Sequence, residues 1–261
     1  MRLLFLLSTA LALIANQAWA LPKSISIVAD AWCPYNCDAE GDKKGYVVDI
    51  AKAIFEPEGI SVHYEIMPWT RAIRLTRNGT HTAVIAATTN EAKKFVFPQE
   101  IIGISDYRFY TLADHKWRFN GDMQSIHPIS LGVVDGYSYD IRMDAFISKH
   151  RNHREHIQVV GGSNASKQNI KKLIAKRIEV MLEDPNVLAY KMNEMGVTTS
   201  LRDAGALDTT IEQDELLYLA FSPKHPDAKS LATLFDKGLR KLRKTGKLNS
   251  ILERYGIKDW K

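Results

Sequence analysis

The chain lacks several features that mark particular classes of protein. It has only two cysteines in 261 residues, and no stretch beyond the first twenty residues approaches the roughly 20 apolar residues that a membrane-spanning helix needs. It also has no low-complexity segment, nucleophile elbow, phosphate-binding glycine loop or zinc motif. These absences argue against a membrane-spanning protein and against the common hydrolase, nucleotide-binding and zinc-dependent classes.

The chain also lacks a strong excess of charge. The formal net charge is +5, and the Lys and Arg residues are spread over expected helix surfaces instead of clustering with aromatic residues. This distribution is typical of solvated helix faces and predicts no nucleic-acid partner. Three histidines, His150, His153 and His156, lie in one basic stretch, but their spacing does not put them on one helix face. We therefore predict no metal site and no cofactor.

The first twenty residues have the pattern of a secretory signal peptide. Arg2 precedes an apolar run over residues 3–14, and Ala18-Trp19-Ala20 is a small-x-small cleavage site. Removing residues 1–20 takes away Arg2 and lowers the net charge from +5 to +4. The first cysteine, Cys33, lies well beyond the cleavage site, so we expect no lipid anchor. The pattern predicts a soluble mature chain in the periplasm or outside the cell.

Both cysteines lie within five residues of each other, in Cys33-Pro34-Tyr35-Asn36-Cys37. An oxidising compartment favours a disulfide between them. The spacing is one residue longer than the C-x-x-C redox motif, and no further cysteine is present to complete a metal site. We therefore predict that a Cys33–Cys37 bridge stiffens a loop.

Strand and helix patterns alternate along the mature chain, which is typical of parallel sheets covered by helices. The first unit predicts strands at 24–29, 62–66 and 82–87, with helices at 48–55 and 70–75. The second unit predicts strands at 131–134, 157–160 and 178–182, with helices between them. Two further strands, 107–114 and 216–221, are expected to pair as a hinge. We expect two α/β lobes: residues 21–111 with 216–261 form lobe I, and residues 112–215 form lobe II.

Three motifs, in this order and spacing, carry a resemblance to a known family. They are Trp32-Cys33-Pro34-Tyr35, Gly45-Tyr46-Val47-Val48-Asp49-Ile50, and the terminal pattern Leu242, Gly246, Ile251, Arg254 and Tyr255. The chain resembles the bacterial extracellular solute-binding proteins of family 3, receptors that feed polar amino acids to ABC transporters. The resemblance covers essentially the whole mature chain. It implies the type II periplasmic binding protein fold, with two lobes joined by two hinge strands around a ligand, and a monomeric protein.

The resemblance also implies particular binding residues. Trp32 and Trp69 match the aromatic positions that flank the ligand, and each follows a predicted strand, where a flat ring can stack on a planar group or face a cation. Ser138 matches the hydroxyl of a strand-to-helix turn whose backbone amides hold a carboxylate. Asp184 matches the acid that accepts the ligand's α-ammonium. The alternatives are core tryptophans for Trp32 and Trp69, and helix caps for Ser138 and Asp184.

The sequence departs from the family where amino-acid receptors carry an arginine that clamps the ligand's α-carboxylate. The family pattern Thr-x-x-Arg reads Thr88-Thr89-Asn90-Glu91 here. A carboxylate would repel that ligand group. Either Arg71 replaces the clamp instead of being a solvated helix residue, or Glu91, Glu183 and Asp184 form an acidic pocket with the two tryptophans for an ammonium or guanidinium compound. The sequence favours a cationic or zwitterionic solute.

We therefore expect a periplasmic solute-binding protein without catalysis, which passes a small polar ligand to an inner-membrane ABC permease. One alternative is a receptor that reports ligand occupancy to a membrane sensor protein. The other is a periplasmic dehydratase-like enzyme on the same fold, in which Glu91 or Asp184 would be the perturbed acid or base.

Overall fold

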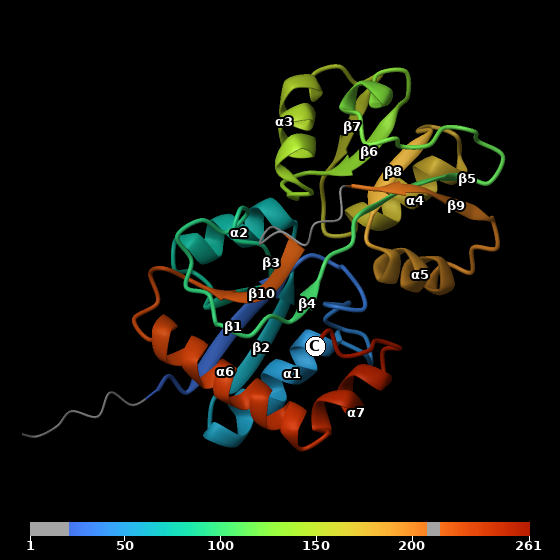
Figure 1. Cartoon of the computed structure of the whole chain (residues 1–261). Helices are drawn as coiled ribbons and strands as arrows, with labels where there is room; N and C mark the ends of the chain where they lie inside the picture. The colour runs from blue at the N-terminus through green and yellow to red at the C-terminus, as the bar shows by residue number, and fades with distance from the viewer. Residues whose placement is uncertain (1–20, 208–214) are drawn as a thin grey trace, which may run out of the picture.

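The computed structural model describes residues 21–207 and 215–261, which form two lobes, each built on a five-stranded sheet (Figure 1). The strand order is β2-β1-β3-β10-β4 in lobe I and β7-β6-β8-β5-β9 in lobe II. The signal peptide predicted for residues 1–20 lies outside the described residues. None of the described helices combines the length and the apolar character that crossing a membrane requires.

Lobe I has three parallel strands, as the alternation of strand and helix patterns in the sequence predicts. β1 pairs in parallel with β2 and β3, β10 runs antiparallel to β3, and the short β4 pairs with β10. The strands are β1 (Ser24–Ala29), β2 (Ser61–Ile66), β3 (Ala83–Ala87), β4 (Gly103–Ile104) and β10 (Leu216–Phe221). The helices are α1 (Tyr46–Phe55), the 3₁₀ turn η1 (Glu56–Glu58), α2 (Trp69–Arg77), α6 (Ala228–Lys244) and α7 (Lys247–Glu253).

The lobe I sheet is covered on both faces. Successive residues of a strand point to opposite faces, and in β1 and β3 residues of both faces are buried. Ile27 and Ile85 face a core shared with α1, α6 and α7, whereas Val28 and Val84 pack with α2 residues. The C-terminal helices α6 and α7 therefore pack on lobe I. Gly45, which precedes α1, has φ 106°, and a Cβ there would lie 2.4 Å from the Tyr35 carbonyl oxygen. Only glycine fits this start of the helix.

Lobe II repeats the arrangement with β6 between β7 and β8, all parallel, and with β5 antiparallel to both β8 and β9. The strands are β5 (Arg108–Leu112), β6 (Leu131–Val134), β7 (Ile157–Val160), β8 (Val180–Glu183) and β9 (Leu201–Ala206). The helices are η2 (Met123–Ile126), α3 (Ile141–His150), α4 (Ala165–Ile174) and α5 (Pro185–Glu194).

Neighbouring chain segments join the two lobes. The sequence predicted that β5 and β10 would pair with each other, and this prediction was wrong. β5 lies wholly in the lobe II sheet and β10 in the lobe I sheet. Beside them, the Ser105 amide donates to the Glu215 carbonyl at 2.9 Å, and the Leu207 amide donates to the Tyr107 carbonyl at 3.4 Å. On the outward path, the change of sheet falls between β4 and β5, slightly before the lobe boundary expected at residue 111.

The predicted disulfide between Cys33 and Cys37 is present, in the loop between β1 and α1. Both cysteines are buried, and the peptide bond between Cys33 and Pro34 is cis. The bridged loop carries Trp32, Tyr35 and Asn36, all of which face lobe II or the space between the lobes. The disulfide therefore holds part of the candidate site described next.

Candidate functional site

The candidate site lies where the carboxyl ends of β1 and β3 in lobe I meet those of β6 and β8 in lobe II. Loops that follow the carboxyl ends of parallel strands gather polar groups at one edge of a sheet. Here two such edges face each other and are in contact through side-chain hydrogen bonds. Tyr137 Oη donates to Asp30 Oδ2 at 2.6 Å, and Trp32 Nε1 donates to Glu183 Oε1 at 2.9 Å.

Three more hydrogen bonds cross between the lobes. The Ser138 amide donates to Glu91 Oε1 at 3.1 Å, and Tyr35 Oη donates to Asp184 Oδ2 at 3.3 Å. The third joins the Ala31 amide to the Ser163 carbonyl at 2.8 Å. Four of these five hydrogen bonds end on a carboxyl oxygen, so contact between the lobes depends on acidic residues.

A small cavity lies inside this contact. Its volume is about 10 Å³, roughly the space that one water molecule occupies. Its walls are aromatic, acidic and amide side chains with two small aliphatic ones: Asp30, Trp32, Asn36, Trp69, Ile85, Ala86, Glu91, Tyr107 and Tyr137. Among the residues that the structure describes, no Lys, Arg or His lines this cavity. A solute larger than a water molecule would need the lobes to move apart.

Aromatic rings form the walls of this inner cavity. Trp32 stacks on Tyr35 with ring centroids 4.4 Å apart and an interplanar angle of 19°. Tyr137 presents its ring at a steep angle to both Trp32 and Trp69, with centroids 6.2 and 6.3 Å apart. Both tryptophans are nearly fully buried, yet both line the cavity. The structure therefore brings together the two tryptophans singled out in the sequence.

Four carboxyl groups of the contact surface have raised pKa values, chiefly because burial removes them from water. The pKa of Asp30 rises to about 6, although the Tyr137 hydrogen bond and the charge of Lys191 lower it in part. Burial raises the pKa of Glu91 and of Glu183 to about 7. The pKa of Asp184 also rises to about 7, and the neighbouring Glu183 contributes to that rise.

Asn36 adds an acceptor to the inner cavity. Its Nδ2 donates to the Asp30 carbonyl at 2.6 Å, so the remaining polar atom of the side chain is the acceptor Oδ1. Oδ1 is buried and has no hydrogen-bond partner among the described residues. A buried acceptor without a partner is costly, and a donor from a bound molecule would satisfy it.

Glu91 lies in the turn after β3 and bonds to three different segments. Oε2 accepts from the Thr88 amide at 2.9 Å and from Thr88 Oγ1 at 3.1 Å. Oε1 accepts from Trp69 Nε1 at 3.2 Å and from the Ser138 amide at 3.1 Å. The residue that stands where amino-acid receptors carry arginine is thus surrounded by donors, and it lines the inner cavity.

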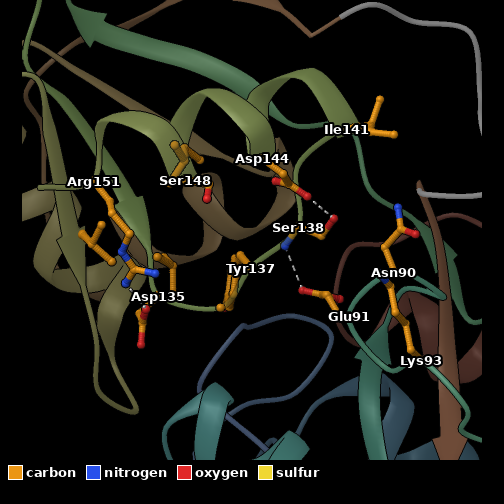
Figure 2. A pocket seen from close by; sticks show the side chains of 14 residues that line it. Asn90, Glu91, Lys93, Asp135, Tyr137, Ser138, Ile141, Asp144, Ser148 and Arg151 are labelled. Atoms are coloured by element: carbon orange, nitrogen blue, oxygen red, sulfur yellow. Dashed lines mark hydrogen bonds and ion pairs between the residues drawn. The ribbon is translucent and has the colours of Figure 1, made fainter.

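Ser138 lies in the turn between β6 and α3, on the far side of Glu91. Figure 2 shows its amide directed at Glu91 and its hydroxyl directed at Asp144. The hydroxyl donates to Asp144 Oδ2 at 2.5 Å, and the N-cap of α3 is Asp140. The lobes approach closely here, since a Cβ on Gly136 would lie 2.6 Å from Thr70 Cγ2. In this arrangement the backbone of the turn, and not the Ser138 hydroxyl, faces lobe I.

A second, larger cavity of about 530 Å³ lies on the outer side of the contact between Glu91 and Ser138 (Figure 2). Its lining includes Glu91 and Tyr137, which also line the inner cavity, together with Lys93 from lobe I and Arg151, the C-cap of α3. Arg151 pairs with Asp135 at 3.3 Å. Glu91 and Tyr137 therefore form a wall that the inner and the outer cavity share.

Asp184 is the N-cap of α5. Its Oδ1 accepts from the amides of Asn186 at 2.8 Å and Val187 at 3.2 Å. Oδ2 accepts from Tyr35 Oη and from the Asp106 amide at 3.4 Å. Asp184 is fully buried and is not part of either cavity lining. In this arrangement its carboxylate serves the helix and the contact between the lobes.

Arg71 is exposed on the first turn of α2 and is not part of either cavity lining. The structure thus brings together Trp32, Trp69 and Glu91 in the inner cavity, with Ser138 beside them, and leaves Arg71 on the surface. Sequence reasoning missed Asp30, Asn36, Tyr107 and Tyr137 as cavity residues. Asp30 could have been found from the sequence, because it directly follows β1 and the other candidates were also sought at the ends of predicted strands.

Comparisons with known proteins agree with this architecture. A family model described as bacterial extracellular solute-binding proteins, family 3, matches residues 25–258. An ancestral arginine-binding protein bound to arginine is 16% identical with a TM-score of 0.70, over 90% of this chain and 99% of that chain. A histidine kinase sensor domain with similarity to periplasmic binding proteins is 18% identical with a TM-score of 0.70, over 89% and 96% of the two chains.

A third similar structure is an ancestral amino-acid-binding protein described as a precursor of cyclohexadienyl dehydratase. It is 17% identical with a TM-score of 0.67, over 89% of this chain and 95% of that chain. At such identities these structures support the fold, the type II periplasmic binding protein fold expected from the sequence.

Proposed function

Because this chain belongs to the bacterial extracellular solute-binding proteins of family 3, we propose that it is a periplasmic receptor for a small cationic solute. The lobes close on the solute, and the closed form delivers it to an ABC permease without chemical change. The ligand class is an ammonium or guanidinium compound that needs no carboxylate of its own.

The chemistry of the inner cavity carries this proposal. Its charged lining residues are the acids Asp30 and Glu91, its unpartnered polar atom is the acceptor Asn36 Oδ1, and its walls are tryptophan and tyrosine rings. Acids, a free acceptor and π faces all favour a cation with N–H donors. An α-carboxylate would meet two buried acids and no lysine or arginine, which is unfavourable.

We assign the solute contacts to Asp30, Trp32, Trp69 and Glu91. The sequence-based assignment of Asp184 to the ligand's ammonium requires that acid to give up its bonds to α5 and Tyr35. Arg71 would have to turn from the surface into the cavity, and the Ser138 hydroxyl would have to leave Asp144. Asp30 already lines the cavity, so it is the simplest acceptor for the solute's cationic group.

The test is a thermal-shift screen of the mature protein against diamines, guanidinium compounds, betaines, amino acids and small carboxylates. A ligand at about 100 times its Kd stabilises a protein by about 2.7 kcal/mol, which is readily visible as a rise in Tm. Amines and guanidinium compounds without a carboxylate should raise the Tm. If only α-amino acids raise the Tm, the proposal of an acidic pocket for a cation is wrong, and a positively charged side chain such as Arg71 must enter the site.

A pair of isosteric variants then locates the acceptor. Asp30→Asn should weaken binding of the best cationic probe at least about 10-fold, because it removes a charge that faces the solute. Asp184→Asn should change the affinity less than about threefold, because asparagine can also cap α5. Isothermal titration calorimetry measures both. If Asp184→Asn weakened binding more than Asp30→Asn, Asp184 would be the acceptor of the solute's ammonium group.

Two other functions fit the same fold. A sensor would use the closed form to contact a membrane signalling protein, and a dehydratase-like enzyme would use an acid of the cavity as a proton donor or acceptor. The raised pKa of Glu91, about 7, is the observation that favours the second of these. Loss of a bound probe over time, followed by NMR, would indicate turnover. An intact probe after prolonged incubation supports binding alone.

A further inference from the structure

The two oxygens of Glu91 have hydrogen bonds of different origin. Oε2 takes part in a local motif: it accepts from the Thr88 amide, while the Glu91 amide donates to Thr88 Oγ1 at 3.3 Å. This reciprocal pair has the hydrogen-bond pattern of a capping box, formed here in a turn that does not continue as a helix, and the Thr-x-x-Glu spacing accounts for it. Oε1 has no part in that motif. Its donors are Trp69 Nε1 on α2 and the Ser138 amide in lobe II.

The donors around Glu91 form a site for one carboxylate. Two backbone amides, one hydroxyl and one indole N–H converge on its two oxygens at 2.9 to 3.2 Å. All four are neutral donors, and they come from three segments that are distant in the sequence. Backbone amides in such turns favour an anion. The space between these donors holds one carboxyl group, which belongs to the protein itself.

We propose that Glu91 is a tethered carboxylate that fills an anion site shared by the two lobes, so that the solute neither needs nor can place a carboxylate there. Because Glu91 takes all four donors, a free carboxylate finds no partner and is repelled by the charge already present. Glu91 is therefore the residue that selects amines over the corresponding amino acids. This last step rests on the proposed function, whereas the existence of the anion site does not.

The position of Glu91 makes the site accessible once the side chain is shortened. Glu91 and Tyr137 line both cavities, and the outer cavity has a volume of about 530 Å³. In a Glu91→Ala variant the removed carboxyl group would leave a space next to that cavity. A small anion such as formate could then enter from outside and accept the same hydrogen bonds.

Chemical rescue with formate tests the site without knowledge of the solute. Melting temperatures of wild type and Glu91→Ala are measured at pH 8 in sodium formate and in sodium chloride of equal ionic strength. Burial raises the pKa of Glu91 to about 7, so the wild-type side chain is ionised at this pH. Formate should raise the Tm of Glu91→Ala saturably by about 3 °C or more relative to chloride, and that of wild type by less than about 1 °C. Equal shifts in both proteins would overturn the proposal.

Glu179→Ala is the matched control. Glu179 also accepts from the amide and hydroxyl of one residue, Ser130, at 2.9 and 3.2 Å, but its side chain is 45% exposed. It lacks donors from a second lobe, so formate should have no specific effect on Glu179→Ala. Rescue of this variant as well would mean that formate stabilises the protein generally, which would contradict the proposal.

A second variant keeps the test decisive if Glu91→Ala does not fold. Glu91→Gln retains the side-chain volume and an acceptor for the capping box but removes the charge. Wild type should bind agmatine at least about 10-fold more tightly than arginine, a pair that differs only in the carboxylate, and Glu91→Gln should reduce that preference at least about threefold. An unchanged ratio would contradict the assigned role of Glu91. Failure of both probes to bind, with formate rescue intact, would contradict the proposed function alone.

Discussion

Glu91 and Asp184 are both acids of the contact between the lobes, and their hydrogen bonds follow the same plan. In each, one oxygen accepts from two donors of its own turn or helix, and the other accepts a donor from the opposite lobe. Burial raises both pKa values to about 7. Hydrogen-bond partners and pKa values alone therefore do not distinguish the two acids.

The surroundings of Glu91 and Asp184 distinguish the two acids. Glu91 lines both the inner and the outer cavity, whereas Asp184 is fully buried and is not part of either lining. Glu91 is in the cavity lining that a solute between the lobes would meet, whereas the Asp184 carboxylate accepts hydrogen bonds from α5, Tyr35 and the Asp106 amide. We therefore propose that Asp184 is chiefly a structural cap and that Glu91 selects the solute.

The largest expected effect is on stability against pH, and it comes from both acids together with Asp30 and Glu183. Their folded-state pKa values of about 6 to 7 lie above the ordinary values of 3.8 and 4.5. Between about pH 4.5 and 7 the folded state therefore binds more protons than the unfolded state, and stability falls as pH rises. The slope is about 1.4 kcal/mol per pH unit for each proton.

We expect the free energy of unfolding in urea to fall by about 3 kcal/mol or more between pH 5 and pH 7.5. Other titrating groups change stability over the same range, so the variants Glu91→Gln and Asp184→Asn provide the comparison. Each should reduce the slope, because each removes one group with a raised pKa. A slope that neither variant changes would mean that these acids titrate normally in the folded protein.

The next effect distinguishes a cap from a solute contact. Asp184→Ala removes the N-cap of α5 and the partner of Tyr35 Oη, and should lower the free energy of unfolding by about 2 kcal/mol at pH 7.5. Asp184→Asn retains a capping oxygen and should cost less than about 0.5 kcal/mol. Urea denaturation followed by circular dichroism measures both. Equal losses in the two variants would mean that the charge of Asp184, and not its capping oxygen, stabilises the fold.

Much of the fold was predictable because its signals are local. Strands β6 and β7 were expected at residues 131–134 and 157–160 and have those bounds. Helix α5 was anticipated only through the alternative that Asp184 caps a helix, and no bounds were predicted for it, because it buries only Val187, Leu188 and Lys191, too few apolar positions to give a clear helical period. Strand β9 was missed because Leu201–Ala206 has no β-branched or aromatic residue, carries Arg202 and Asp203 side by side, and contains Gly205, all of which weaken a strand pattern.

The site was predictable only in part because its contacts join distant segments. Trp32 and Trp69 were found because each follows a predicted strand. Glu91 was found because it stands where the family carries an arginine. The Tyr137–Asp30 hydrogen bond joins residues 107 positions apart, and neither has a local pattern that names its partner. The sequence also left open whether the Ser138 hydroxyl would contact the solute or cap a helix, because the direction of that hydroxyl depends on how the turn between β6 and α3 faces lobe I.

The smallest expected effect tests that choice. Ser138→Ala removes the hydrogen bond to Asp144 Oδ2 and keeps the amide that donates to Glu91 Oε1. Stability should fall by about 1 kcal/mol, because one buried hydroxyl contact is lost. The affinity for a cationic probe should stay within about twofold of wild type, since the hydroxyl faces α3 and not the solute. A 10-fold loss of affinity in calorimetry would instead place the hydroxyl at the solute, and would assign Ser138 the role that its position in the sequence first indicated.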